Sequence, residues 1–120
     1  MAKILVADDD ESIRLLYREE LQQEGHEVVT ASSATEALAL IDAVEPDLVT
    51  LDVKMPGQDG ITTLREIKAR HPGLPVVMCT AYSSFKRNYA SIASDAYVVK
   101  SADTTELKDV IRRVLAREAR

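Results

Sequence analysis

Short apolar runs alternate along the chain with longer segments in which apolar residues recur every three or four positions. The short runs are rich in β-branched residues and predict strands at residues 3–8, 27–31, 47–52, 75–80 and 96–100. The segments between them carry the apolar stripe of amphipathic helices, most clearly Leu107, Val110, Ile111 and Val114. The pattern therefore predicts five consecutive strand–helix units.

Residues at the segment ends support these boundaries. The stretches from Ser33 to Glu36 and from Asp103 to Glu106 have the sequence of capping boxes, which favour helix starts. Gly25 suits the end of one helix, residues 71–73 suit the end of another, and residues 56–57 form a Pro–Gly turn signal. Each expected helix is thus bounded by residues that favour its beginning or its end.

Strands that alternate with single helices pair in parallel through right-handed crossovers, with helices on both faces of the sheet. We predict an α/β fold with a doubly wound, five-stranded parallel sheet in the order 2-1-3-4-5. In that order ligands bind beyond the carboxyl ends of the first and third strands, where the winding reverses. Those ends lie at residues 8 and 52 in this chain.

Size and composition narrow the function further. A chain of 120 residues with 46% apolar and 29% charged residues predicts one globular domain spanning residues 1–120. The net charge of -5 argues against direct nucleic-acid binding, which needs clustered Lys and Arg. The apolar run at residues 4–7 is too short for a signal peptide or a membrane span, so we expect no membrane association and a cytoplasmic location. The single cysteine, Cys79, lies in an apolar run and is expected to be buried.

Charged and polar residues follow the predicted strands at the edge where ligands bind. Asp8 and Asp9 follow the first strand, Asp52 ends the third, Thr80 the fourth and Lys100 the fifth. The carboxyl ends of parallel strands share one edge of the sheet, so these side chains should meet there. Asp10 and Glu11 are better explained as capping residues of the first helix.

This set of side chains suits one kind of chemistry. Clustered carboxylates need a compensating cation, and an oxygen-only cluster suits Mg²⁺. A hydroxyl and an ammonium beside Mg²⁺ are what a transferred phosphoryl group requires, and a carboxylate can receive that group as an aspartyl phosphate. Asp52 is the natural nucleophile because it lies between the metal side and the Lys100 side.

Four segments carry a family resemblance, in order and in spacing: ILVADDDESIR (4–14), DLVTLDVKMPGQDG (47–60), PVVMCTA (75–81) and YVVK (97–100). They resemble the motifs of response-regulator receiver domains of two-component signalling, in particular single receivers of the chemotaxis and sporulation kind. The resemblance covers essentially the whole chain. It implies a flavodoxin-like (βα)5 fold.

The resemblance also implies roles for individual residues. Asp52 would be the phosphoacceptor, and Mg²⁺ would be held directly by Asp9, largely through water by Asp8, and by the backbone carbonyl of Lys54. The phosphoryl-binding and switch positions would be Thr80, Ala81, Lys100 and Tyr97. Lys54 and Tyr82 occupy positions that tune phosphoryl lifetime in this family, and we expect these long side chains to shield the acyl phosphate from water.

Two departures from the family pattern affect the loop that follows the last strand and the helix before it. Ser101 stands where receivers usually have a cis proline, so we expect a trans bond after Lys100. Ser94 and Asp95 precede the last strand where the family usually has a Gly–Ala pair. Residues 83–94 form the weakest predicted helix, which would suit a switching element.

The implied function is a signalling switch and not an enzyme with a diffusible product. It would catalyse its own aspartyl phosphorylation and dephosphorylation, taking the phosphoryl group from a phosphohistidine on a sensor histidine kinase or a histidine phosphotransfer protein. The switched face would comprise residues 83–94, the last strand and the last helix, and its recipient would be a downstream protein or a fused output domain. A phosphorylation-dependent homodimer remains open.

Three alternatives fit the sequence less well. An aspartyl phosphohydrolase commonly has a second acid two residues after its nucleophile, where this chain has Lys54. A receiver-like module without phosphorylation would not need the full set of Asp8, Asp9, Asp52, Thr80 and Lys100. A flavin or nucleotide binder would want a glycine-rich or hydroxyl-rich loop after the first strand, where this chain has acids.

Overall fold

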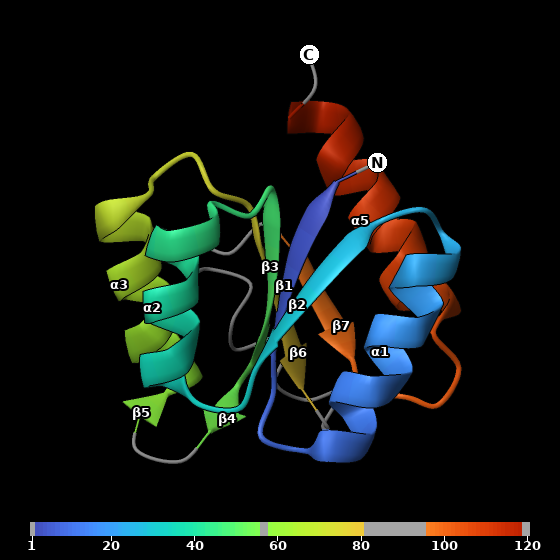
Figure 1. Ribbon diagram of the computed structural model, residues 1–120, viewed down its shortest axis with the longest axis horizontal. Coiled ribbons are helices and arrows are strands. Elements are labelled where there is room, and N and C mark those ends of the chain that lie inside the picture. Colours follow the sequence, from blue (N-terminus) through green and yellow to red (C-terminus); the bar gives the residue numbers. More distant parts are fainter. Residues whose placement is uncertain (1, 56–57, 81–95, 119–120) are drawn as a thin grey trace.

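A central parallel sheet organises the computed structural model, which describes residues 2–55, 58–80 and 96–118 (Figure 1). Its strand order is β2-β1-β3-β6-β7, the 2-1-3-4-5 order predicted from the sequence. The strands are β1 (Lys3–Ala7), β2 (Glu27–Ala31), β3 (Leu48–Asp52), β6 (Val76–Thr80) and β7 (Ala96–Val99). Each lies within one or two residues of its predicted range, so the α/β prediction is confirmed.

Two pairs of helices cover the sheet. Helices α1 (Glu11–Gln23) and α5 (Thr105–Glu118) lie on one side, and α2 (Ala34–Val44) and α3 (Gly60–Arg70) lie on the other (Figure 1). A short antiparallel pair, β4 (Lys54–Met55) and β5 (Gln58–Asp59), was not predicted from the sequence. The helix expected at residues 83–94 lies outside the described residues.

Alternation along the central strands builds two apolar cores. Ile4 and Val6 of β1 belong to the core under α1 and α5, whereas Leu5 and Ala7 belong to the core under α2 and α3. All five residues of β3 are buried, as expected for a central parallel strand covered on both faces. The same alternation decides on which side of the sheet each residue at a strand end projects.

The helix ends mostly follow the capping signals. Asp10 caps α1 by accepting hydrogen bonds from Ser12, and Ser33 caps α2 by accepting one from the Glu36 N–H. Gly25 follows α1 with a positive φ of 91°, as a helix-ending glycine should. The capping box predicted at Asp103 is incomplete: Asp103 accepts from Thr105, but the Glu106 carboxylate accepts from the Val99 N–H of β7.

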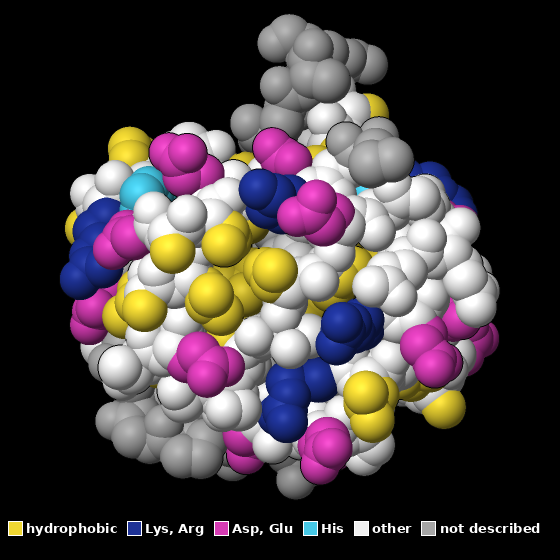
Figure 2. Space-filling view, viewed as in Figure 1, with side chains coloured by type: hydrophobic (Ala, Val, Ile, Leu, Met, Phe, Trp, Pro, Cys, Tyr) yellow, Lys and Arg dark blue, Asp and Glu magenta, His cyan; other side chains and the backbone are white. Residues whose placement is uncertain are grey.

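The surface mixes charges of both signs. On the face that carries α2, β2 and α1, Lys and Arg side chains are interspersed with Asp and Glu (Figure 2). Hydrophobic side chains gather between α2 and β2 in the same view, where the partly buried residues are Val29, Leu38 and Leu40. No helix in the described ranges has both the length and the hydropathy to cross a membrane.

Candidate functional site

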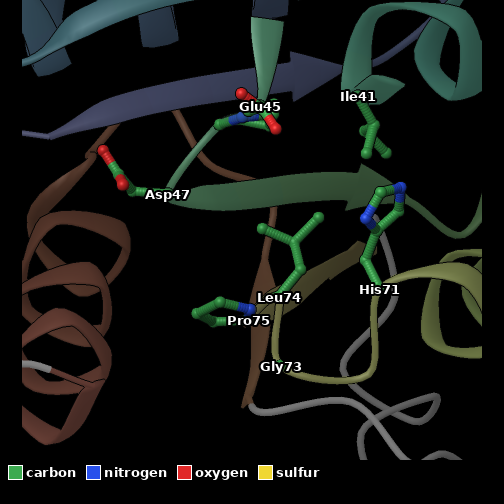
Figure 3. A pocket seen from close by; sticks show the side chains of 8 residues that line it. Ile41, Glu45, Asp47, His71, Gly73, Leu74 and Pro75 are labelled. Carbon is green, nitrogen blue, oxygen red and sulfur yellow. The ribbon is translucent and has the colours of Figure 1, made fainter. Parts of the chain in front are cut away.

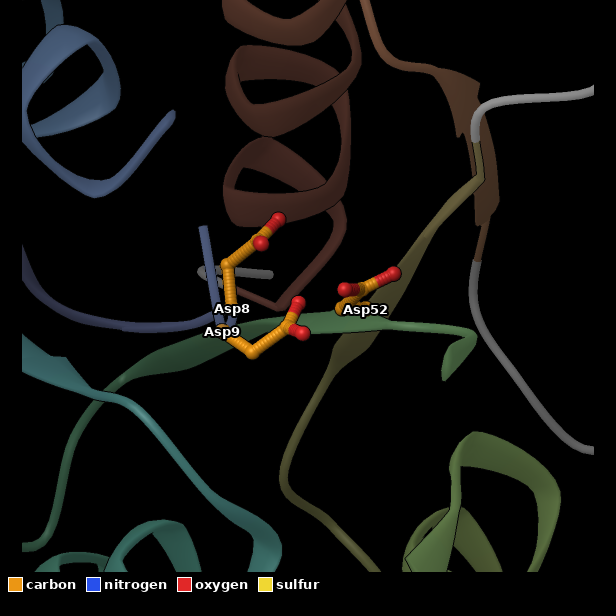
Figure 4. Close-up of side chains that lie close together, drawn as sticks. All are labelled: Asp8, Asp9 and Asp52. Carbon is orange, nitrogen blue, oxygen red and sulfur yellow. The ribbon is translucent and has the colours of Figure 1, made fainter. Parts of the chain in front are cut away.

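Three carboxylates converge at the carboxyl edge of the sheet and form what we call the acid pocket: Asp8, Asp9 and Asp52. β1 and β3 are neighbours, with Ala7 paired to Leu51, so the residues after one strand reach the last residue of the other. One oxygen from each carboxylate lies within 4.8 Å of the others, and Asp9 points toward Asp52 (Figure 4). Asp8 and Asp52 are only 2% and 5% exposed, whereas Asp9 is exposed.

Lys100 supplies a positive charge to the acid pocket from the end of β7. Its Nζ lies 2.8 Å from an oxygen of Asp8 and 3.0 Å from an oxygen of Asp52. Burial disfavours the charged ammonium, but the hydrogen bonds and negative charges of Asp8 and Asp52 outweigh burial and raise the pKa of Lys100. The lysine is therefore firmly protonated at neutral pH.

Thr80 and Tyr97 lie on the opposite side of the sheet from this ion pair. Tyr97 packs against the core under α2 and α3, and its hydroxyl oxygen is buried. Thr80 ends β6 and is 2% exposed, and alternation from Met78 places its side chain on the same face as Tyr97. The Thr80 carbonyl accepts the Lys100 N–H at 2.6 Å, so a backbone hydrogen bond joins the ends of β6 and β7.

Asp8 is held by protein groups at several atoms. Its N–H donates to the Ala31 carbonyl at 3.0 Å, and its second carboxylate oxygen accepts the Asp10 N–H at 2.9 Å. Its carbonyl oxygen accepts a hydrogen bond from Nη1 of Arg14 at 2.8 Å. The sequence alone did not indicate this contact of Arg14, because it forms only in the folded loop.

Gly60 fits closely against the backbone at the end of β3. A Cβ atom at this position would lie 2.7 Å from the carbonyl oxygen of Asp52 and equally close to Cα and the carbonyl oxygen of Val53. The Gly60 N–H donates to the Val53 carbonyl at 2.7 Å. The absence of a side chain thus lets α3 begin against the end of β3.

Two buried polar side chains lie beneath the acid pocket, on the side covered by α1. Cys79 pairs with Asp52 across β3 and β6, and burial raises the pKa of its thiol to about 12. Tyr17 of α1 lies beside this thiol, and burial also raises the pKa of Tyr17. Cys79 is buried as predicted, whereas the polar contact of Tyr17 was not foreseen because its spacing indicated only an apolar stripe.

Comparison with known proteins identifies the family. The family model described as the response regulator receiver domain matches residues 4–112. The chain belongs to the response-regulator receiver family. Sporulation initiation phosphotransferase F of Bacillus subtilis is 33% identical over 115 residues, which cover 94% of this chain and 93% of that protein.

Other relatives are longer. The transcriptional regulatory protein ZraR of Escherichia coli is 38% identical over 94% of this chain, and the match covers 26% of the regulator. A probable transcriptional regulator of Cyanophora paradoxa, ycf27, is 38% identical, and the match covers 48% of it. The chain therefore spans half or less of these two relatives.

Solved receivers share the fold. The response regulator TrrA of Thermotoga maritima, solved in complex with Mg²⁺ and BeF, superposes with a TM-score of 0.89 and is 41% identical, covering 95% of this chain and 99% of that one. A CheY-like receiver of Methanospirillum hungatei superposes with a TM-score of 0.91 at 30% identity, covering 99% and 97% of the two chains.

The loop after β7 departs from the usual receiver pattern. No peptide bond in the described residues is cis, so the bond between Lys100 and Ser101 is trans, as expected. The Ser101 hydroxyl accepts the Asp103 N–H at 3.1 Å, and Asp103 in turn accepts from Thr105. Side chains therefore support the loop of this receiver at the position where a proline is usual.

Some of the predicted receiver positions lie outside the described residues. Ala81 and Tyr82 belong to the part that the structure does not describe. Lys54 is placed by its backbone in β4, directly after the acid pocket, but its side chain is likewise not described. The roles assigned to these three residues remain predictions, as do those assigned to the other site residues.

A separate pocket opens at the amino ends of the strands, opposite the acid pocket. It has a volume of about 410 Å³ and is lined by residues that include Glu45, Asp47, His71 and Leu74 (Figure 3). His71 Nε2 lies 2.9 Å from an oxygen of Asp42, which joins α2 to the end of α3. The pocket does not touch the receiver's acid pocket, and the sequence analysis did not identify it.

Proposed function

We propose that this receiver accepts a phosphoryl group on Asp52 from a phosphohistidine of a partner protein, with Mg²⁺ as the cofactor. One observation carries the proposal: the buried Asp52 carboxylate lies 3.0 Å from the Lys100 ammonium, which also pairs with Asp8 at 2.8 Å, and oxygens of Asp8, Asp9 and Asp52 lie within 4.8 Å of one another. A carboxylate nucleophile that lies beside both an ammonium and further carboxylates able to bind a cation can receive a phosphoryl group.

The residues present fit Mg²⁺. The three acids offer only oxygen ligands, which Mg²⁺ prefers, and their negative charges exceed the single charge that Lys100 supplies. Asp9 is the exposed member and the best direct ligand, with Asp52. Asp8 would act largely through water because both its carboxylate oxygens already have protein partners. One accepts the Asp10 N–H, and the other pairs with the Lys100 ammonium. The backbone carbonyl of Lys54 would complete the protein ligands.

In the transfer step an oxygen of Asp52 attacks the phosphorus atom of the phosphohistidine. The P–N bond breaks as the O–P bond forms, and the electron pair of the broken bond stays on the imidazole nitrogen. Bound Mg²⁺ would offset negative charge on the phosphoryl oxygens. Lys100 would pair with one of these oxygens and Thr80 would donate a hydrogen bond to another.

Thr80 and Tyr97 would carry the signal away from Asp52. They share one face of the sheet, so a movement of Thr80 toward the phosphoryl group would shift the packing of the Tyr97 ring. The proposed readout is the face that comprises residues 83–94, β7 and α5. Ala81 would belong to the same phosphoryl-binding segment, and Lys54 and Tyr82 would slow loss of the group by shielding it.

The partners follow from the chemistry and from the relatives. The phosphodonor would be a sensor histidine kinase or a histidine phosphotransfer protein in the cytoplasm, and the recipient of the signal a downstream protein or a fused output domain. The Bacillus subtilis relative is named a phosphotransferase, and TrrA was solved with Mg²⁺ and BeF. Both names support a phosphoryl-transfer role for this receiver.

Intact-protein mass spectrometry after incubation with acetyl phosphate and Mg²⁺ tests the proposal. We expect a single phosphoryl adduct that EDTA abolishes and that Asp52→Asn lacks. Asp109→Asn makes the same chemical change at an exposed site on α5 and should keep the adduct. An adduct that survives in Asp52→Asn, or no adduct where TrrA is modified under the same conditions, would contradict the proposal.

A further inference from the structure

Arg14 connects α1 to the acid pocket through the main chain. It is the fourth residue of α1 and half-buried, and its backbone N–H continues the helix by donating to the Asp10 carbonyl at 3.0 Å. Its Nη1 reaches back along the chain and donates to the Asp8 carbonyl at 2.8 Å. The side chain therefore bonds to the loop that carries the acids and not to a carboxylate.

The carbonyl that Arg14 holds belongs to the peptide bond between Asp8 and Asp9. A peptide unit is planar, so the hydrogen bond to this oxygen restrains the plane from which Asp9 continues. The preceding peptide unit is held separately, because the Asp8 N–H donates to the Ala31 carbonyl at 3.0 Å. The orientation of the Asp8–Asp9 plane sets the direction in which the exposed Asp9 side chain leaves the backbone. Of the three acids, Asp9 is the exposed one, so surrounding side chains restrain it less than they restrain the buried Asp8 and Asp52.

We propose that Arg14 is a positioning residue for the metal site, acting through the Asp8–Asp9 peptide and not through its charge. The inference rests on the Mg²⁺ binding included in the proposed function. By its charge alone, an arginine near the acid pocket would repel Mg²⁺, so its removal would tighten metal binding. By its hydrogen bond it pre-organises Asp9, so its removal would weaken metal binding. The two effects differ in sign.

Isothermal titration calorimetry with Mg²⁺ alone, without any phosphodonor, separates them. We expect Arg14→Met, which removes the charge and the donor, to raise the Kd for Mg²⁺ by about tenfold, the lower end for partners that orient metal ligands. Arg14→Lys keeps a charged donor and should recover most of the affinity. Arg18→Met removes the same charge from an exposed position one turn further along α1 and should leave the Kd within about twofold of wild type.

The outcomes decide the inference in either direction. An unchanged or lower Kd in Arg14→Met would overturn it, and so would a Kd in Arg18→Met that rises as much. If the circular dichroism spectrum shows that Arg14→Met does not fold, Arg14→Gln replaces it. Gln also removes the charge, and its shorter side chain does not reach the Asp8 carbonyl. A wild-type protein that binds no Mg²⁺ would overturn the proposed function as well, whereas normal wild-type binding with unaffected variants would overturn only the role of Arg14.

Discussion

At the scale of single residues, the charge balance of the acid pocket sets both its chemistry and its cost. Lys100 contributes one positive charge to Asp8 and Asp52, and Asp9 adds a third carboxylate within 4.8 Å. Like charges held this close destabilise the folded state until a cation joins them. The surplus of negative charge in this pocket therefore lowers the stability of the folded state unless a cation is bound.

Asp52→Asn should therefore stabilise the protein when Mg²⁺ is absent. Asparagine has nearly the same volume, removes one of the three negative charges and still offers an oxygen to Lys100. We expect the free energy of unfolding in EDTA to rise by about 1 kcal/mol. Mg²⁺ at a hundred times its Kd should then stabilise the wild type by about 2.7 kcal/mol and the variant much less, which reverses their order.

Urea unfolding followed by circular dichroism, with and without Mg²⁺, measures both effects. Asp109→Asn serves as the control because it removes the same charge from an exposed site on α5, and it should respond to Mg²⁺ as the wild type does. An Asp52→Asn variant that is less stable than wild type in EDTA would show that the Lys100 ion pair outweighs the repulsion among the acids.

At the scale of elements, the sequence pattern predicted the features that follow from the periodic spacing of apolar residues, namely the strands, the helices and their order. Strand order and the convergence of Asp8, Asp52 and Lys100 follow from alternating strands and helices, because parallel strands bring their carboxyl ends to one edge. The pattern missed features of the backbone that leave no apolar periodicity. The β4–β5 pair is one example, and Glu45 is another, since it ends α2 with a φ of 50° where a glycine would be usual.

Arg14 and Tyr17 show the same limit within one helix. Both lie on α1, where spacing distinguishes only buried from exposed positions. Arg14 donates to the carbonyl of Asp8, which lies in the loop after β1. Tyr17 lies beside the sulfur of Cys79, which belongs to β6. Such contacts arise from tertiary packing, so no local sequence signal could have indicated them.

The start of α3 depends on Gly60. Gly60→Ala would place a methyl group 2.7 Å from backbone atoms of Asp52 and Val53, and backbone cannot yield as a flexible side chain can. We expect a loss of about 1–3 kcal/mol in the free energy of unfolding, together with slower phosphorylation by acetyl phosphate. Urea unfolding and mass spectrometry measure the two quantities.

Gly73→Ala is the matched control for that substitution. Nothing lies within 4 Å of a Cβ placed at Gly73, so this variant should be as stable as wild type or slightly more stable. Equal losses in the two variants would mean that the close approach of Gly60 to β3 is not what the structure depends on.

At the scale of the whole molecule, the acid pocket and the Tyr97 side chain lie on opposite sides of the sheet. Asp8, Asp52 and Lys100 form their ion pairs at the carboxyl edge, on the side of α1 and α5, whereas Tyr97 packs in the core under α2 and α3. The Lys100 N–H joins the ends of β6 and β7 through the Thr80 carbonyl. This hydrogen bond therefore connects the strand that carries Lys100 with the strand that carries Thr80 at the edge where Asp52 lies.

The chain has a single cysteine, so the rate at which a thiol reagent labels it measures how often the protein core opens. Cys79 is 2% exposed and its side chain lies in the core under α1 and α5, so a disulfide reagent such as DTNB can reach it only when the chain unfolds far enough to part these helices from the sheet. We expect labelling of the native protein to be slow and labelling in urea to be fast. Because that opening also dismantles the acid pocket, Mg²⁺ at ten times its Kd should slow labelling by about tenfold. Fast labelling that ignores Mg²⁺ would contradict this. The rate of Cys79 labelling would therefore report how often the core of the receiver opens, and its dependence on Mg²⁺ would report how strongly the bound ion suppresses that opening.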